Sequence, residues 1–210
     1  MKRKLYLGIL VCMLLGLILL LGGCTIDVAD GSKDSKNELN KNSVSSNKAT
    51  DFKFSDLEDV EFWFGSGAGG WNTVLYIEED GTFTGYYHDS DMGVNGEGYP
   101  KGTRYECTFS GKFKELKKIG DYEYSMKCED LVLEDEVGEE EIIDGIKIIY
   151  SEPYGLNDAN EFFLYLPGKN VDELPEEFLS WAHQSWEDGK LICYGLYNVS
   201  GEQGFIVWPE

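Results

Sequence analysis

Residues Trp71–Tyr87 read WNTVLYIEEDGTFTGYY, two runs of alternating apolar and polar residues on either side of a turn. Alternation with a period of two is typical of half-buried strands, because successive side chains point to opposite faces of a sheet. Gly81 can adopt the left-handed conformation that a three-residue connection with a glycine bulge requires. The stretch therefore predicts an antiparallel hairpin. Its predicted pairs are Ile77 with Phe83 and Leu75 with Gly85.

Alternating runs at 105–113 and 122–128 predict a second hairpin, with its turn at Leu116–Ile119. A one-residue slip would expose every apolar side chain, so the pattern also predicts the register. The predicted pairs are Phe113 with Tyr122, Gly111 with Tyr124, Phe109 with Met126 and Cys107 with Cys128. In an oxidising compartment this register would permit a Cys107–Cys128 disulfide. The alternative is that these two residues and Cys193 are small buried hydrophobes with free thiols.

The remaining pattern predicts further strands and one helix. Asp144-Gly145 indicates a hairpin turn, Phe162–Leu166 a short strand, and Leu191–Tyr197 with Gly204–Trp208 a C-terminal pair. The helix is predicted from a cap at Asp172, Pro175 in the first turn, and the stripe Phe178, Trp181, Ala182 and Trp186. Eight to nine antiparallel strands with one helix in the C-terminal half predict a mainly β fold, either a barrel or a sandwich. The glycine-rich lead into Trp71, the hairpins and the late helix resemble lipocalin-like barrels.

The N-terminus indicates export. A basic head, Met1-Lys2-Arg3-Lys4, precedes an apolar run at Leu5–Leu21, as in a signal peptide. The sequence Leu21-Gly22-Gly23-Cys24 resembles the lipobox of bacterial lipoproteins. That resemblance implies cleavage between Gly23 and Cys24 and a diacylglycerol thioether on Cys24. Two or more acyl chains anchor a protein stably. The alternative is an uncleaved membrane helix, and both place the rest of the chain outside the cytoplasm.

Three segments follow from this interpretation. They are a lipoprotein signal peptide at 1–23, a lipidated cysteine with a polar tether at 24–51, and one β-rich extracytoplasmic domain at 52–210. The tether is rich in Ser, Asn, Lys and Asp and has too little apolar surface to offset the entropy of ordering it. The formal net charge of the chain is -21, which argues against nucleic-acid binding because no basic patch could neutralise phosphates.

Residues that could support catalysis or metal binding are few. The chain has two histidines and none of the familiar hydrolase or phosphate-binding motifs. Asp89 and Asp91, with Glu97 further on, resemble the start of a calcium loop, because hard cations prefer several carboxylate oxygens. The alternative is a solvated turn between strands, with no metal and no cofactor. The same two aspartates do not show the geometry of a glycosidase pair.

Several short segments resemble the sequences of a group of small lipoproteins from clostridial-type bacteria. Among these segments are Gly69-Gly70-Trp71, Ser151–Gly155 and Leu174–Leu179. The resemblance implies a class and no mechanism. We expect a non-enzymatic protein, anchored to the cell membrane on its extracytoplasmic face, that binds a small ligand or an envelope partner. In a barrel, the mouth near Asp89–Gly102 would admit the ligand. The alternatives are a carbohydrate-active or other hydrolase that uses acidic residues, and a structural or interaction protein of the cell envelope.

Overall fold

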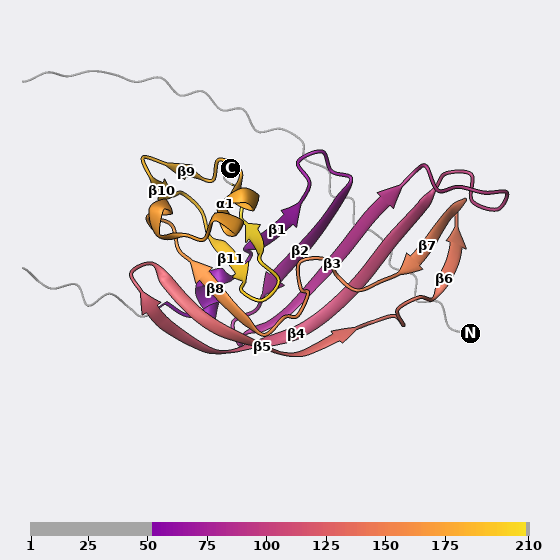
Figure 1. Ribbon diagram of the computed structural model, residues 1–210. Helices are drawn as coiled ribbons and strands as arrows, with labels where there is room; N and C mark the ends of the chain where they lie inside the picture. Colours follow the sequence, from indigo (N-terminus) through magenta and orange to yellow (C-terminus); the bar gives the residue numbers. More distant parts are fainter. Residues whose placement is uncertain (1–51, 209–210) are drawn as a thin grey trace, which may run out of the picture. The chain divides into compact units, whose positions relative to one another are not determined.

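Eight antiparallel strands close into a barrel within residues 52–208, which are the residues that the computed structural model describes (Figure 1). The barrel strands are β1 (Glu61–Gly65), β2 (Trp71–Ile77), β3 (Thr82–Asp91), β4 (Thr103–Gly120), β5 (Glu123–Leu133), β8 (Glu161–Tyr165), β11 (Gly195–Asn198) and β12 (Gln203–Ile206). The other elements are η1 (Phe54–Leu57), β6 (Glu140–Ile143), β7 (Ile146–Tyr150), η2 (Val171–Glu173), α1 (Glu176–Ala182), β9 (Trp186–Glu187) and β10 (Lys190–Leu191). The predicted signal peptide, the tether, Gly23 and Cys24 lie outside the described residues.

The strands follow the order β1, β2, β3, β4, β5, β8, β11, β12, and β12 pairs with β1 to close the ring. Every neighbouring pair in the ring is antiparallel. The predicted mainly β fold, an antiparallel barrel with one α-helix in its C-terminal half, is therefore confirmed, and the alternative of a sandwich is wrong. Within residues 52–208, the structure contains no helix with the length and apolarity needed to span a membrane.

Aromatic side chains fill the barrel. Phe62, Phe83, Phe162 and Phe205 are fully buried, and Phe109 is 1% exposed. An interior ringed by eight strands is just wide enough for side chains to fill it. The predicted ligand entrance near Asp89–Gly102 would lead into the barrel interior, and these rings occupy that interior.

The first hairpin forms in the predicted register. Ile77 lies opposite Phe83, Leu75 lies opposite Gly85, and Gly81 has a φ of 82°. The absence of a side chain at Gly85 lets the ring of Phe109 lie against its backbone, where a Cβ would overlap the ring. This hairpin therefore builds one wall of the core from local sequence alone.

The predicted register of the second hairpin is wrong. β4 continues through Leu116–Ile119 to Gly120 and turns at Asp121 and Tyr122, whose φ is 61°. The register also shifts at three places along the pair, so simple alternation cannot be counted across it. The observed partner of Cys128 is Phe113, whereas Cys107 lies opposite Tyr87 of β3. The three cysteines of the described residues, Cys107, Cys128 and Cys193, are free thiols.

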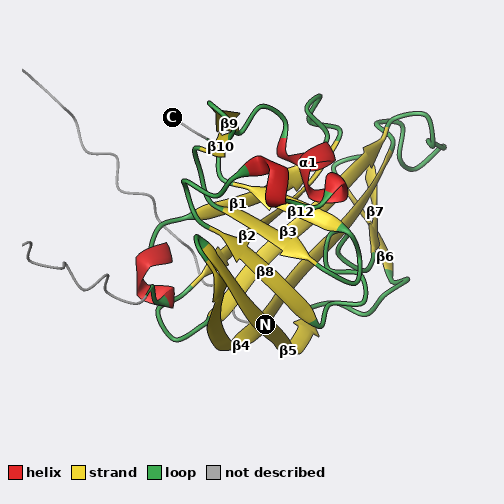
Figure 2. Cartoon of the chain, turned by 60° about the vertical axis from the view of Figure 1, so that its left-hand side comes forward, coloured by secondary structure: helices red, strands yellow, loops and turns green. Residues whose placement is uncertain are grey.

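The helix is shorter than predicted. α1 begins after Pro175, which occupies the N-cap, and ends at Ala182, because His183 turns into the left-handed region with a φ of 33°. Asp172 belongs to η2, where Asn170 accepts the capping hydrogen bond, and Trp186 lies in β9. Figure 2 shows α1 lying over β12 on the outside of the barrel. Phe178 is fully buried there because β11 and β12 carry glycines beneath its ring.

The β6–β7 hairpin extends the sheet beyond the barrel (Figure 1). Asp144 and Gly145 both have positive φ, at 51° and 81°, as a two-residue hairpin turn requires. β7 pairs in parallel with the first residues of β4, whose later residues pair with β5. The predicted turn here is confirmed, as are the strand at β8 and the pairing of two C-terminal strands. These two strands are shorter than predicted, because β11 begins only at Gly195, with Leu191 in β10, and β12 ends at Ile206.

Candidate binding groove

Residues 151–160, which we call the bridging segment, connect β7 to β8 by passing against the barrel core. Leu156 is 3% exposed and packs with the buried residues of the barrel. The backbone of Gly155 lies close to the rings of Phe64 and Phe205, so no side chain would fit there. The hydroxyl of Thr73 in β2 donates to the carbonyl of Tyr154. The segment is therefore fixed to both β2 and the C-terminal strands.

Two buried amides hold the bridging segment in place. Nδ2 of Asn198, a residue with no exposed surface, donates to the carbonyl oxygens of Gly155 at 3.2 Å and Asn157 at 2.8 Å. Nε2 of Gln203 donates to Oδ1 of Asn157 at 2.9 Å. Buried polar groups of a loop must find partners, and side-chain amides supply them here. The bridging segment is thus an integral part of the folded barrel.

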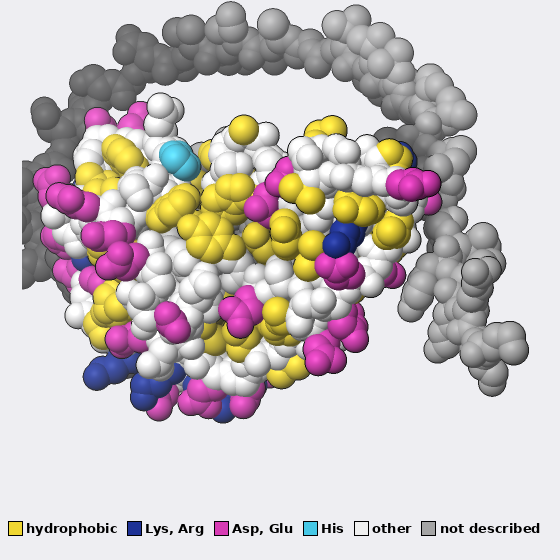
Figure 3. All heavy atoms as spheres, turned by 45° about the vertical axis from the view of Figure 1, so that its right-hand side comes forward, with side chains coloured by type: hydrophobic (Ala, Val, Ile, Leu, Met, Phe, Trp, Pro, Cys, Tyr) yellow, Lys and Arg dark blue, Asp and Glu magenta, His cyan; other side chains and the backbone are white. Residues whose placement is uncertain are grey.

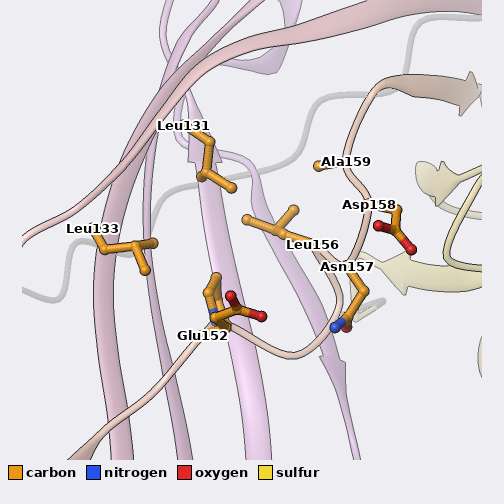
Figure 4. Close-up of a pocket in the computed structure, with 8 residues that line it drawn as sticks. Leu131, Leu133, Glu152, Leu156, Asn157, Asp158 and Ala159 are labelled. Carbon is orange, nitrogen blue, oxygen red and sulfur yellow. The ribbon is translucent and has the colours of Figure 1, made fainter. Parts of the chain in front are cut away.

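A groove opens between β5 and the bridging segment, and we call it the lateral groove (Figure 4). Its volume is about 390 Å³. Figure 4 shows Leu131 and Leu133 pointing from β5 toward Leu156 on the opposite wall. Its residues are Leu131, Leu133, Pro153, Leu156 and Ala159 on the apolar side, and Glu152, Asn157 and Asp158 on the polar side.

The groove exists because β5 and β8 separate. The two strands pair from Glu123 to Lys127, and the last backbone bond runs from the Cys128 N–H to the Asn160 carbonyl at 2.7 Å. Beyond it, the chain that precedes β8 turns away into the bridging segment. A bulge at Asp130, with a φ of 55°, changes the course of β5 at the same level and leaves Leu131 37% exposed.

The surroundings of the groove are acidic. Glu152 and Asp158 line it, and Glu134 and Asp135 follow directly after β5. Burial raises the pKa of the nearby Cys107 thiol to about 11, and Asp135, Glu134 and Glu152 contribute to the rise. Lys114 on β4 is already paired with Glu129 and lies 3.6 Å from Asp130. Figure 3 shows a face of the molecule with apolar and acidic side chains close together and few lysines or arginines.

The structure does not bring the predicted ligand residues together as a metal site. Asp89 and Asp91 lie in β3, so the stretch predicted as a turn is a strand as far as Asp91, and Glu97 is exposed in the loop that follows. Oδ1 of Asp91 accepts backbone N–H groups from Gly93 at 2.8 Å and Val94 at 3.2 Å. No group of three metal-ligating side chains is found among residues 52–208.

Sequence reasoning missed the lateral groove. Its two walls come from segments separated along the chain, and the only local signal is the apolar run Leu131-Val132-Leu133 beside an acidic stretch. In comparisons with known proteins, no family model matches the chain, and no match is found among curated proteins or solved structures.

Proposed function

We propose that the protein is a lipid-anchored, extracytoplasmic binding module without enzymatic activity, and that its ligand occupies the lateral groove. The observation that carries this proposal is a groove of about 390 Å³ whose lining combines five apolar residues with three polar ones. This volume lies within the range of ligand-binding sites. Because aromatic rings fill the barrel, a ligand is accommodated at the side of the barrel and not within it.

The lipid anchor is proposed because of the lipobox-like sequence that ends at Cys24. Replacing Cys24 by serine removes the sulfur that the lipid would occupy. We expect Cys24→Ser to lose incorporation of labelled fatty acid and to abolish signal cleavage at Gly23. The matched control is Cys12→Ser, a thiol within the signal peptide, which should leave labelling and mature mass unchanged. A parent protein without fatty-acid modification would contradict the anchor.

The groove is tested with a library of small neutral, cationic and anionic fragments, followed by NMR spectra of the full chain in detergent. Leu131→Arg places a charged side chain in the groove, and we expect fragment affinity to fall about tenfold or more. Val132→Arg is the matched control, because Val132 is 57% exposed and points to the opposite face of β5. The proposal fails if no ligand, whether a fragment or a peptide, shifts groove resonances, or if both variants weaken binding equally.

A further inference from the structure

Within the described part of the chain, one edge of β5 has no partner along the lateral groove. Between Glu123 and Lys127 the strand is paired on both sides, with β4 and with β8. From Glu129 to Leu133 it is paired with β4 alone. Among residues 52–208, no backbone hydrogen bond joins Glu129–Leu133 to the bridging segment. An unpaired strand edge is a template onto which another extended chain can add.

The backbone at this edge points into the groove. The Glu134 N–H donates to the Thr108 carbonyl at 2.9 Å, so Glu134 faces β4. Hydrogen bonding alternates from residue to residue in an antiparallel pair. The N–H and C=O of Leu133 therefore point away from β4, on the side where the groove lies. An added strand would find backbone partners and an apolar wall at the same place.

The carboxylates around the free edge of β5 favour a partner of opposite charge. Glu152, Asp158, Glu134 and Asp135 form no salt bridge within the described residues. A second copy would bring the same carboxylates into contact, and like charges suppress such pairing. A chain with lysine or arginine at alternate positions would match both the carboxylates and the strand geometry.

We infer that the lateral groove binds an extended basic polypeptide segment of a partner protein, which adds to the free edge of β5 as a strand. This inference rests on the proposed function, because it names the ligand class of the same groove. Apolar side chains of the segment would lie against Leu131, Leu133 and Leu156. Its basic side chains would reach Glu152 and Asp158 at the rim.

The test uses three nine-residue peptides with blocked ends and the full chain in detergent. The first alternates lysine and valine, the second is the same peptide with alternate amides N-methylated, and the third alternates glutamate and valine. We expect the first to bind with an affinity that falls steeply with salt. N-methylation should weaken binding about tenfold or more, because it removes the backbone donors of an added strand. The glutamate peptide should not bind.

Variants then locate the charges that bind the peptide. Glu152→Gln with Asp158→Asn should weaken the lysine peptide several-fold and flatten its salt dependence. Asparagine tolerates the left-handed φ of 51° at position 158, so the fold is kept. The matched control is Glu139→Gln with Glu187→Gln, which changes the net charge equally at exposed positions outside the groove.

The outcomes separate this inference from the proposed function. If fragments bind in the groove and the lysine peptide does not, the inference alone is overturned. If neither fragments nor peptides bind, the inference and the proposed function are both overturned. Equal binding of the N-methylated peptide would overturn strand addition. A dimer that forms through the groove would identify a second copy as the occupant and would also overturn the inference.

Discussion

Phe109→Ala is expected to lower the free energy of unfolding by about 3–5 kcal/mol, the range for truncating a buried aromatic ring. Phe109 is 1% exposed, and its ring lies against the backbone of Gly85 and 6.4 Å from the ring of Phe83. Its removal leaves a cavity that the closed wall of the barrel cannot collapse to fill. Urea unfolding followed by tryptophan fluorescence measures the change.

A double-mutant cycle tests the contact between Phe109 and Gly85. Gly85→Ala alone should destabilise the barrel, because its Cβ would overlap the Phe109 ring. In the Phe109→Ala background the same change should cost less, because the overlap with the ring is gone, although the overlap with the backbone carbonyl of Val74 remains. Thr84→Ala, an exposed neighbour on the outer face of β3, is the control and should change stability little. Additive effects of the two changes would show that this contact does not shape the core.

Asn198→Asp is expected to cost about 3–5 kcal/mol at neutral pH, as an uncompensated buried charge does. Its side chain has no exposed surface and faces the carbonyl oxygens of Gly155 and Asn157, which repel a carboxylate. Burial and these carbonyls would raise the pKa of the new carboxyl above its value in the unfolded chain. The loss of stability should therefore be largest above that raised pKa and shrink as the pH falls through it.

Urea unfolding of Asn198→Asp at pH 7 and pH 5, each relative to the parent protein, measures this dependence. Hydrogen exchange should also become faster across the bridging segment, because Asn198 anchors its backbone. Asn160→Asp introduces the same charge at an exposed position and is the control. An Asn198→Asp protein with parental stability at pH 7 would contradict the anchoring role of this amide.

Local signals explain which parts of the fold were predictable. The β2–β3 hairpin was predictable from Gly81, and the β6–β7 turn was predictable from Asp144-Gly145. Both turns require residues that tolerate positive φ, and such residues can be recognised in a sequence. In β4 and β5, Glu115 and Asp130 take up positive φ within the strands. The wrong partner for Cys128 comes mainly from the turn, which lies at Asp121 and Tyr122 and not at Leu116–Ile119. The two bulges, which no residue type marks in the sequence, also shift the register.

The candidate site was not predictable for a different reason. Asp89 and Asp91 were chosen for their chemical type, yet the strand places them along β3, and no third ligand joins them among residues 52–208. The lateral groove depends on where β8 leaves β5 and on Asn198 and Gln203 holding the bridging segment. Those are tertiary relationships between distant residues, and no local pattern records them.

Trp63 of β1 lies opposite Ile206 of β12, so the first and last strands of the ring complete it together. Until β12 has formed, the early strands have no late strand to cover Phe62 and Phe64. Contacts between residues that are far apart in the sequence form slowly, and apolar surface stays accessible to solvent until they have formed. Folding of this protein therefore includes an interval in which the incomplete barrel is prone to aggregate, and its many acidic side chains repel other copies during that time.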